Sequence, residues 1–256
     1  MVPLHDPRHV CSCSVRRKEI MDIRSSVAFV TGANRGLGLA FARALRARGV
    51  RRVYAGMRNP EPFDDPSIVP VRLDVTDPDT VDSAAEKCGD VTLLVNNAGI
   101  GVVNQGALDP SFVDVARRMF ETNFYGMVHT SQAFAPVIVG NGGGAIINVL
   151  SDATWFARPL VSAYSTTKSA AWNFTNALRL ALRDRGVLVT ALHVGFVDTD
   201  MAGAIDTKKS DPRVVAETAL EGVGNDQEEV LADEQSRRVK STLSAAGYYL
   251  SPPQIG

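Results

Sequence analysis

Short apolar runs alternate with longer amphipathic stretches along most of the chain. The apolar runs predict strands at 27–30, 52–56, 69–73, 91–95, 145–150, 187–194 and near 230–231. The spacing of apolar residues predicts helices over 38–48, 76–87 (with Thr76 as its cap), 112–137 and 162–185, a short helix after Pro212 and a polar C-terminal helix. Buried strands regularly separated by helices are typical of a parallel sheet covered on both faces. We therefore expect an α/β fold, a doubly wound parallel sheet.

The domain organisation follows from the absence of a linker or an internal repeat within residues 26–245. We expect one domain over 23–245, a disordered N-terminal extension over 1–22 and a C-terminal tail over 246–256. The first twenty residues contain charges and two prolines but no apolar core of a secretory signal. A metal cluster of His5, His9, Cys11 and Cys13 is the weaker interpretation, because a second ligand pair is missing. We predict no metal.

Composition narrows the class of protein. The chain has 256 residues with a formal net charge of −1, which gives no reason to expect nucleic acid or an anionic membrane as a partner. No stretch approaches the roughly 18 uninterrupted apolar residues of a membrane helix. The three cysteines are an odd number in a chain too large to need disulfides, which favours a reducing compartment and a cytoplasmic location.

A glycine-rich turn follows the first predicted strand and reads Thr-Gly-Ala-Asn-Arg-Gly-Leu-Gly over 31–38. Glycines in a strand–turn–helix unit let the backbone approach a pyrophosphate at the helix N-terminus. An ordinary tight turn is the alternative, but the position directly after a buried strand favours a nucleotide. The expected architecture is therefore a Rossmann-like dinucleotide-binding domain.

The second predicted strand indicates which dinucleotide binds. NAD sites usually place a carboxylate about twenty residues beyond the glycines, on the ribose 2′-hydroxyl. Here the stretch 54–58 has no acid and ends in Arg58, and Arg35 lies within the turn. Two guanidinium groups would attract a 2′-phosphate. We predict NADP(H) in preference to NAD(H); the alternative is that both arginines are solvated surface residues.

Three motifs together resemble the short-chain dehydrogenase/reductase family: the glycine-rich turn at 31–38, Asn-Asn-Ala-Gly at 96–99 and Tyr-x-x-x-Lys at 164–168. The match covers about residues 26–235. The resemblance implies an oxidoreductase that transfers a hydride between nicotinamide and a carbonyl or secondary alcohol. It implies catalytic Ser151, Tyr164, Lys168 and Asn123, the last supporting Lys168 through a water. The cofactor contacts predicted from the turn, the basic residues and the resemblance are Gly32, Asn34, Arg35, Gly36, Leu37, Gly38, Arg58, Asp74, Val75, Asn97, Ala98, Gly99, Tyr164, Lys168, Val197 and Thr199.

The chemistry of the last motif can be argued from the residues. Hydride transfer to a carbonyl leaves an alkoxide that needs a proton, which Tyr164 can supply. A free phenol has a pKa near 10, and a nearby cation lowers it. Lys168 lies one helical turn further on the same face. A hydroxyl at Ser151 could hold the substrate oxygen. The alternative is a Tyr/Lys pair on a solvated helix face, without a catalytic role.

The substrate is expected between two segments, 152–160 and the stretch after Thr199. The first offers Trp155 and Phe156 for packing, and Asp152 and Arg158 as polar handles. The family usually has Pro-Gly in the last loop, where this chain has Val194-Gly195. Without the proline the loop is less constrained, so the predicted contact of this loop with the nicotinamide has less support than the catalytic residues have. Asp74 could equally be an exposed carboxylate.

Three functions stay open: a carbonyl reductase or alcohol dehydrogenase, NAD-dependent in one version; a catalytically silent nucleotide sensor; and an epimerase or dehydratase.

We also expect a homodimer or homotetramer. On the helix 162–185 the apolar stripe contains Ala170, Ala171, Phe174, Ala177, Leu178, Ala181 and Leu182. Trp172 and Leu180 fall outside this stripe, and we expect Trp172 near the contact; the alternative is that a loop covers it.

Overall fold

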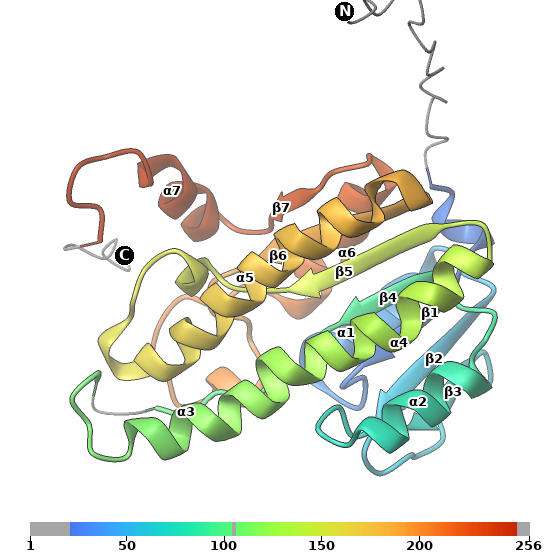
Figure 1. Ribbon diagram of the computed structural model, residues 1–256, viewed down its shortest axis with the longest axis horizontal. Coiled ribbons are helices and arrows are strands. Elements are labelled where there is room, and N and C mark those ends of the chain that lie inside the picture. The colour runs from blue at the N-terminus through green and yellow to red at the C-terminus, as the bar shows by residue number, and fades with distance from the viewer. Residues whose placement is uncertain (1–20, 104–105, 250–256) are drawn as a thin grey trace, which may run out of the picture.

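The structure is a computed structural model that describes residues 21–103 and 106–249 (Figure 1). In these residues seven strands form one parallel sheet in the order β3-β2-β1-β4-β5-β6-β7. The strands are β1 Val27–Thr31, β2 Arg52–Met57, β3 Ile68–Arg72, β4 Leu93–Asn96, β5 Gly144–Val149, β6 Val187–His193 and β7 Glu229–Leu231. Every predicted strand is present, so the predicted α/β sheet is confirmed.

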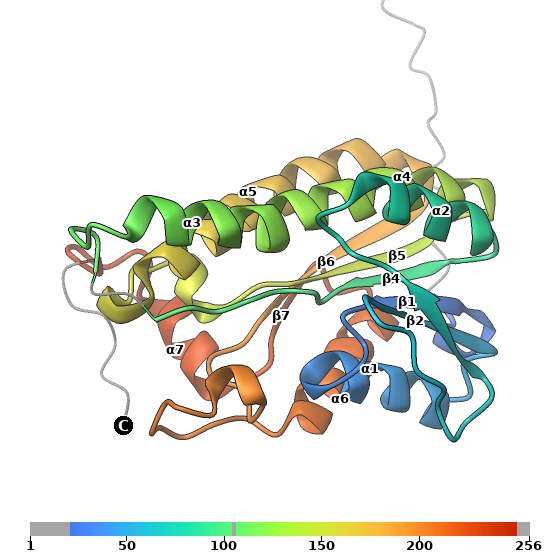
Figure 2. The ribbon, with the colours of Figure 1, turned by 90° about the horizontal axis from the view of Figure 1, so that it is seen from below.

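Helices cover both faces of the sheet (Figure 2). They are α1 Gly36–Ala47, α2 Pro78–Lys87, α3 Phe112–Phe120, α4 Gly126–Gly140, α5 Ser162–Leu182, α6 Pro212–Gly224 and α7 Glu234–Thr242. One apolar core lies under α1 and α6, with Phe41, Leu45 and Leu220 fully buried against the sheet. The other lies under α2, α4 and α5, around Phe134 and Ile138. Burying both faces explains why the strands read as nearly continuous apolar runs.

The strand order reverses at β1, which pairs with β2 on one side and β4 on the other. At such a point successive connections leave in opposite directions, and a crevice opens beyond the carboxyl ends of the strands. The glycine-rich turn follows β1 and the segment from Asn97 follows β4. The topology therefore brings two of the predicted motifs together.

Two predicted helices differ in detail. The predicted cap Thr76 is wrong: α2 is capped by Asp77, whose side chain accepts a hydrogen bond from Asp79, with Pro78 in the first turn. Proline fixes a helical φ and has no N–H to satisfy there, so it sets the boundary. The helix predicted over 112–137 is two helices joined by a π-helical turn, Glu121–Tyr125. The N–H of Gly126 bonds to the carbonyl of Glu121 there.

The predicted apolar stripe of α5 is partly wrong. Ala177 and Ala181 are exposed, whereas Thr175 is fully buried. The Thr175 hydroxyl donates to the Ala171 carbonyl at 2.7 Å and accepts from the Asn148 amide at 2.9 Å. These bonds satisfy the hydroxyl, so that a polar residue can be buried in the core. The buried face of α5 therefore includes Thr167 and Thr175. Trp172 is consequently half-buried beside this face, and Leu180 is 69% exposed.

The sequence predictions for residues 1–20 and 250–256 lie outside the described residues, including the candidate cluster of His5, His9, Cys11 and Cys13. In the described part of the chain no group of His, Cys, Asp and Glu side chains could hold a metal. No helix within 21–103 or 106–249 is long and apolar enough to cross a membrane.

Candidate active site

The glycine-rich turn is shaped by two glycines with positive φ, Gly32 at 65° and Gly36 at 55°. Gly38, in the first turn of α1, permits a close approach: a Cβ there would lie 2.1 Å from the carbonyl oxygen of Gly32. The chain can therefore fold back over the N-terminus of α1 only with a glycine at this position. Backbone N–H groups at a helix N-terminus are suited to bind a pyrophosphate, so the turn fits a dinucleotide.

Thr31 and Asn97 lock the turn to the end of β4. The Thr31 hydroxyl accepts from the backbone N–H groups of Asn97 and Ala98, each at 2.9 Å. The Asn97 side-chain amide donates to the carbonyls of Thr31 at 3.0 Å and Gly32 at 3.3 Å. No role was predicted for the Thr31 side chain. The position of its hydroxyl at the end of a strand, within reach of the neighbouring strand end, was the feature of the sequence that could have indicated this role.

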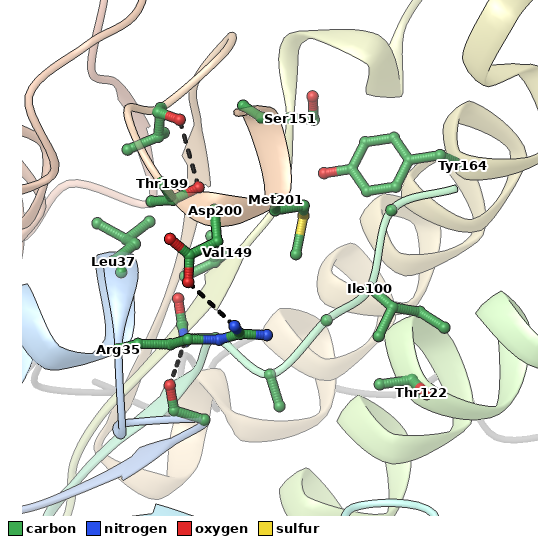
Figure 3. Close-up of a pocket in the computed structure, with 18 of the residues that line it drawn as sticks. Arg35, Leu37, Ile100, Thr122, Val149, Ser151, Tyr164, Thr199, Asp200 and Met201 are labelled. Carbon is green, nitrogen blue, oxygen red and sulfur yellow. Dashed lines mark hydrogen bonds and ion pairs between the residues drawn. The ribbon is translucent and has the colours of Figure 1, made fainter. Parts of the chain in front are cut away.

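A cavity of about 660 Å³ runs along the carboxyl edge of the sheet. It begins beside β2, passes over the glycine-rich turn and ends at Ser151 and Tyr164 (Figure 3). All the predicted site residues line it except Gly38 and Asn123. The topology thus brings residues from the ends of six strands, β1 to β6, into one space large enough for an extended ligand.

Arg35 and Arg58 both line the cavity, as the prediction of a 2′-phosphate site requires. Arg35, however, has a partner: its guanidinium lies 3.0 Å from the carboxylate of Asp200 (Figure 3). Both side chains are more than 70% exposed, so the pair is weak and open to competition. Nothing in the sequence pointed to this contact, because the two residues are 165 positions apart.

Asp74, Val197 and Thr199 lie on the cavity wall where the resemblance placed them. The Asp74 carboxylate accepts from the backbone N–H of Thr76 at 3.0 Å and from its hydroxyl at 2.8 Å. Thr199 packs against the turn, since a Cβ on Gly36 would lie 3.1 Å from its methyl group. The last loop therefore lies directly over the glycine-rich turn although it lacks the family's proline.

Lys168 and Tyr164 point from α5 into the reacting end of the cavity. The Lys168 ammonium donates to the Val149 carbonyl at 2.8 Å and lies 5.6 Å from the centre of the Tyr164 ring. Burial without a carboxylate partner lowers the pKa of Lys168 to about 8. The ammonium is still mostly protonated at neutral pH.

The predicted lowering of the Tyr164 pKa is wrong in this structure. Burial, and next the negative charge of Asp152, raise the pKa of Tyr164 to about 12, against opposing effects of the Ser151 hydrogen bond and the positive charge of Arg158. A phenol with a raised pKa keeps its proton at neutral pH. The residues therefore favour the proton-donating form of Tyr164.

Ser151 follows β5, and in Figure 3 the Tyr164 hydroxyl points towards the space beside it. The Ser151 oxygen accepts from the backbone N–H of Ala153 at 3.1 Å, and its proton is donated to the Asp152 carboxylate at 3.1 Å. A serine held in this way has a fixed position at the cavity end.

Asn123 is in the π-helical turn, buried behind the cavity wall. Its side chain exchanges two hydrogen bonds with the backbone of Ile100, at 2.8 and 2.9 Å, and donates to Thr167 at 3.2 Å. It thereby fixes the segment after β4 against α5. Its support of Lys168 through a water stays a prediction.

The segment predicted to contact substrate divides into two halves. Asp152 and Arg158 line the cavity, and their contact with a substrate stays a prediction. Trp155 stacks on His193 with ring centres 3.9 Å apart, and Phe156 is 6% exposed. Neither aromatic residue lines the cavity, so both have a packing role.

Comparison with known proteins agrees with this geometry. A parallel sheet with a glycine-rich turn at its reversal point and a Ser/Tyr/Lys set in the same cavity defines a nicotinamide-dependent oxidoreductase. The family model for short chain dehydrogenases matches residues 26–210. The chain belongs to the short-chain dehydrogenase family.

The similar proteins include characterised structures with a bound nicotinamide cofactor. A short-chain dehydrogenase from Burkholderia cenocepacia in complex with NADP is 35% identical, with a TM-score of 0.83 over 88% of this chain and 95% of that one. An NADPH-bound carbonyl reductase from chicken fatty liver is 28% identical, with a TM-score of 0.71 over 80% and 93%. A family member from Burkholderia phymatum, 22% identical with a TM-score of 0.72 over 87% and 93%, is in complex with NAD.

Among curated sequences, an uncharacterised oxidoreductase from Staphylococcus saprophyticus is 30% identical over 217 residues, which is 78% of this chain and 92% of the relative. The similar structures hold both forms of the cofactor, so family membership alone does not set the preference between them.

Proposed function

We propose that the protein is an NADP(H)-dependent oxidoreductase that interconverts a ketone or aldehyde and the corresponding alcohol. The observation that carries the proposal is the single cavity that joins the glycine-rich turn to Ser151, Tyr164 and Lys168. A bound nicotinamide would supply the hydride. The chain's own residues then need to hold the substrate oxygen and provide one proton.

Each reacting residue has a role consistent with its surroundings. Tyr164, with its pKa raised to about 12, donates its proton to the oxygen of the reduced carbonyl. Ser151 lies beside it as the second group on that oxygen, once its single proton turns from the Asp152 carboxylate to the substrate. Lys168 is buried at the same end and would hold the ribose of the cofactor, as the resemblance implies, and its charge stabilises the phenolate left after proton transfer.

The preference for NADP(H) rests on the charges at the adenosine end. Arg35 and Arg58 line the cavity there, and the described residues of β2 offer no carboxylate towards it. Changing Arg58 to Asp should weaken NADPH binding selectively, by about 1–3 kcal/mol for a lost charged hydrogen bond. Equal kcat/KM values with NADPH and NADH in the unmodified enzyme would favour an NAD-type or unselective dehydrogenase instead.

The decisive experiment mixes the protein with NADPH and a panel of ketones and aldehydes and follows absorbance at 340 nm. Turnover should be lost in Tyr164→Phe while NADPH still binds. The matched control is Tyr249→Phe, a tyrosine that is 68% exposed and does not line the cavity, which should retain turnover. If Tyr164→Phe kept a tenth of the parent kcat, Tyr164 would not be the proton donor. Tight NADPH binding with no turnover of any carbonyl would favour the nucleotide sensor.

We also propose a homodimer or homotetramer formed through α4 and α5. Partly exposed aromatic residues cluster on this side: the rings of Phe124 and Tyr125 lie 5.1 Å apart, and those of Phe124 and Phe174 lie 6.2 Å apart. Trp172 packs against the same cluster. A self-complementary apolar surface of this kind suits a two-fold contact. Light scattering that gives the mass of one 27.4 kDa chain would refute it.

The cytoplasmic location is likewise a proposal, supported by the cysteine usage. Cys88 is buried, and burial raises the pKa of its thiol to about 12. It therefore packs as an apolar residue with little thiolate character.

A further inference from the structure

A buried ion pair lies beside the reacting residues. The Asp152 carboxylate and the Arg158 guanidinium are 2.5 Å apart, and their side chains are only 2% and 11% exposed. Both residues line the cavity at the end that contains Tyr164. Charges this deeply buried need partners with good geometry, and removal of one partner is costly. The cost of burying these two charges beside Tyr164 suggests that the pair contributes to the function of the site.

Arg158 is held in place by more than its charge. Its guanidinium carbon lies 4.9 Å from the centre of the Phe156 ring and 4.8 Å from that of Phe196. Contacts of a cation with aromatic faces are favourable and directional, more so when water is excluded. Phe156 and Phe196 come from the loops after β5 and β6, so the position of Arg158 depends on both.

Asp152 transmits this position to Ser151. One carboxylate oxygen pairs with Arg158, and the other accepts the proton of the Ser151 hydroxyl at 3.1 Å. The backbone N–H of Asp152 donates to the Val194 carbonyl at 3.1 Å, which anchors the residue to the end of β6. The Ser151 oxygen is therefore held by Asp152 on one side and by the N–H of Ala153 on the other.

We propose that Arg158 and Asp152 are positioning residues for the Ser151–Tyr164 pair: Arg158 holds the Asp152 carboxylate, which orients the Ser151 hydroxyl and faces the Tyr164 phenol with its negative charge. This rests on the proposed function. It adds two residues to the machinery, neither of which touches the reacting atoms. Asp152 keeps the phenol protonated for reduction, and Arg158 keeps Asp152 ionised and in place.

The charges around Tyr164 support this assignment. Asp152 raises the pKa of Tyr164, and Arg158 lowers it with a smaller effect. Lys168 is on the same helix with its ammonium on the Val149 carbonyl. Tyr164 packs against an apolar cluster that contains Val115 and Met119 of α3.

Asp152 has charged neighbours of its own. Burial raises its pKa first, the positive charge and hydrogen bond of Arg158 lower it, and the Asp233 carboxylate raises it further. Asp233 itself accepts from the Gly195 backbone at 2.7 Å. Arg158 is therefore the strongest of the influences that lower the pKa of Asp152, and the Ser151 hydrogen bond acts in the same direction.

The first test reads the phenol directly and needs no turnover. A fluorotyrosine with a more acidic phenol replaces Tyr164, and ¹⁹F NMR follows its titration. Asp152→Asn removes a negative charge from a nearly unchanged shape, so the phenol pKa should fall by about one unit. Asp65→Asn is the matched control, because Asp65 pairs with Arg46 at 3.0 Å outside the cavity. An unmoved pKa in Asp152→Asn would overturn the proposal even if no carbonyl substrate were found.

The second test uses the reaction. In the pH profile of ketone reduction, the rate falls where Tyr164 loses its proton. That limb should move to lower pH in Asp152→Asn, and kcat should fall while the Kd of NADPH stays the same. A fall in activity with an unmoved limb would mean a merely structural role. Absence of turnover in the parent enzyme would refute the proposed function and leave the NMR result to decide this one.

The third test addresses the pair itself. Arg158→Met leaves a buried carboxylate without its partner, so the melting temperature should fall. Adding Asp152→Asn to Arg158→Met removes that carboxylate and should recover part of the loss. The double variant also provides a folded protein should either single variant unfold. A double variant that melts below Arg158→Met would show that the two residues do not depend on one another.

Discussion

The buried ammonium of Lys168 should lower the free energy of unfolding of the protein. Its pKa falls from 10.5 in a free side chain to about 8 in the fold, because burial penalises the ammonium form. A shift of this size corresponds to about 3 kcal/mol, since each pKa unit is 1.36 kcal/mol. Replacing Lys168 with Met removes this penalty but also the hydrogen bond from the charged ammonium to Val149, which contributes about 1.5 kcal/mol. The net expectation is about 2 kcal/mol of added stability at pH 7.

The pH dependence gives the sign of the effect. A lysine whose pKa is depressed by folding costs stability wherever it must be protonated, that is, below its pKa in the fold of about 8. Between pH 8 and 10.5 the folded chain releases this proton before the unfolded chain does, and the cost disappears. The advantage of Lys168→Met should therefore be complete at pH 7 and small near pH 10.

Thermal unfolding without nucleotide measures the difference. For a chain of this size, about 2 kcal/mol corresponds to a rise in Tm of about 4–8 °C. The control Lys87→Met changes an exposed lysine at the end of α2 and should leave Tm nearly unchanged at both pH values. A Lys168→Met variant no more stable than the parent at pH 7, or an advantage equally large at pH 10, would refute the reasoning. Activity should be lost in either case.

Three further changes test the cofactor end and the assembly. Gly38→Ala places a methyl group 2.1 Å from the Gly32 carbonyl and should cost about 1–3 kcal/mol of stability in thermal unfolding, with loss of NADPH binding; a fully stable, binding variant would contradict the close approach. Asp200→Asn frees Arg35, so fluorescence titration should show NADPH binding about 2- to 5-fold more tightly, as expected for loss of a weak exposed pair, and unchanged affinity would mean that the pair does not compete. Leu180→Glu, at a 69% exposed position of α5, should leave Tm unchanged yet shift the mass in light scattering towards a monomer; an unshifted mass would place the contact elsewhere.

Interactions between neighbours in the chain could be predicted well. Alternating strands and helices gave the parallel sheet, because strands buried on both faces need apolar runs whatever their order in the sheet. The glycines at 32, 36 and 38 were predicted to shape the turn, and each has a local steric reason. The spacing of Tyr164 and Lys168 placed both on one face of α5, since one helical turn fixes that relation.

Helix details depended on contacts that the sequence does not reveal. The π-helical turn at Glu121–Tyr125 interrupts a helix whose sequence reads as continuous, and its Asn123 bonds to the backbone of Ile100, 23 residues earlier. The burial of Thr175 depends on Asn148 in a neighbouring strand. In both cases a polar partner from another element overrides what the local sequence favours, a regular α-helix in the first case and an exposed threonine in the second.

The sequence by itself determined the sheet, the turn and the candidate reacting side chains, because these follow from periodicity, steric limits and residue chemistry. Only the tertiary structure decided their electrostatic state. The pKa of Tyr164 is raised by burial and Asp152 where the nearby Lys168 alone predicted a lower value. Arg35 contacts Asp200 from a distant loop. A pKa or an ion pair depends on distance and solvent exposure in three dimensions, and residues far apart in the chain set both.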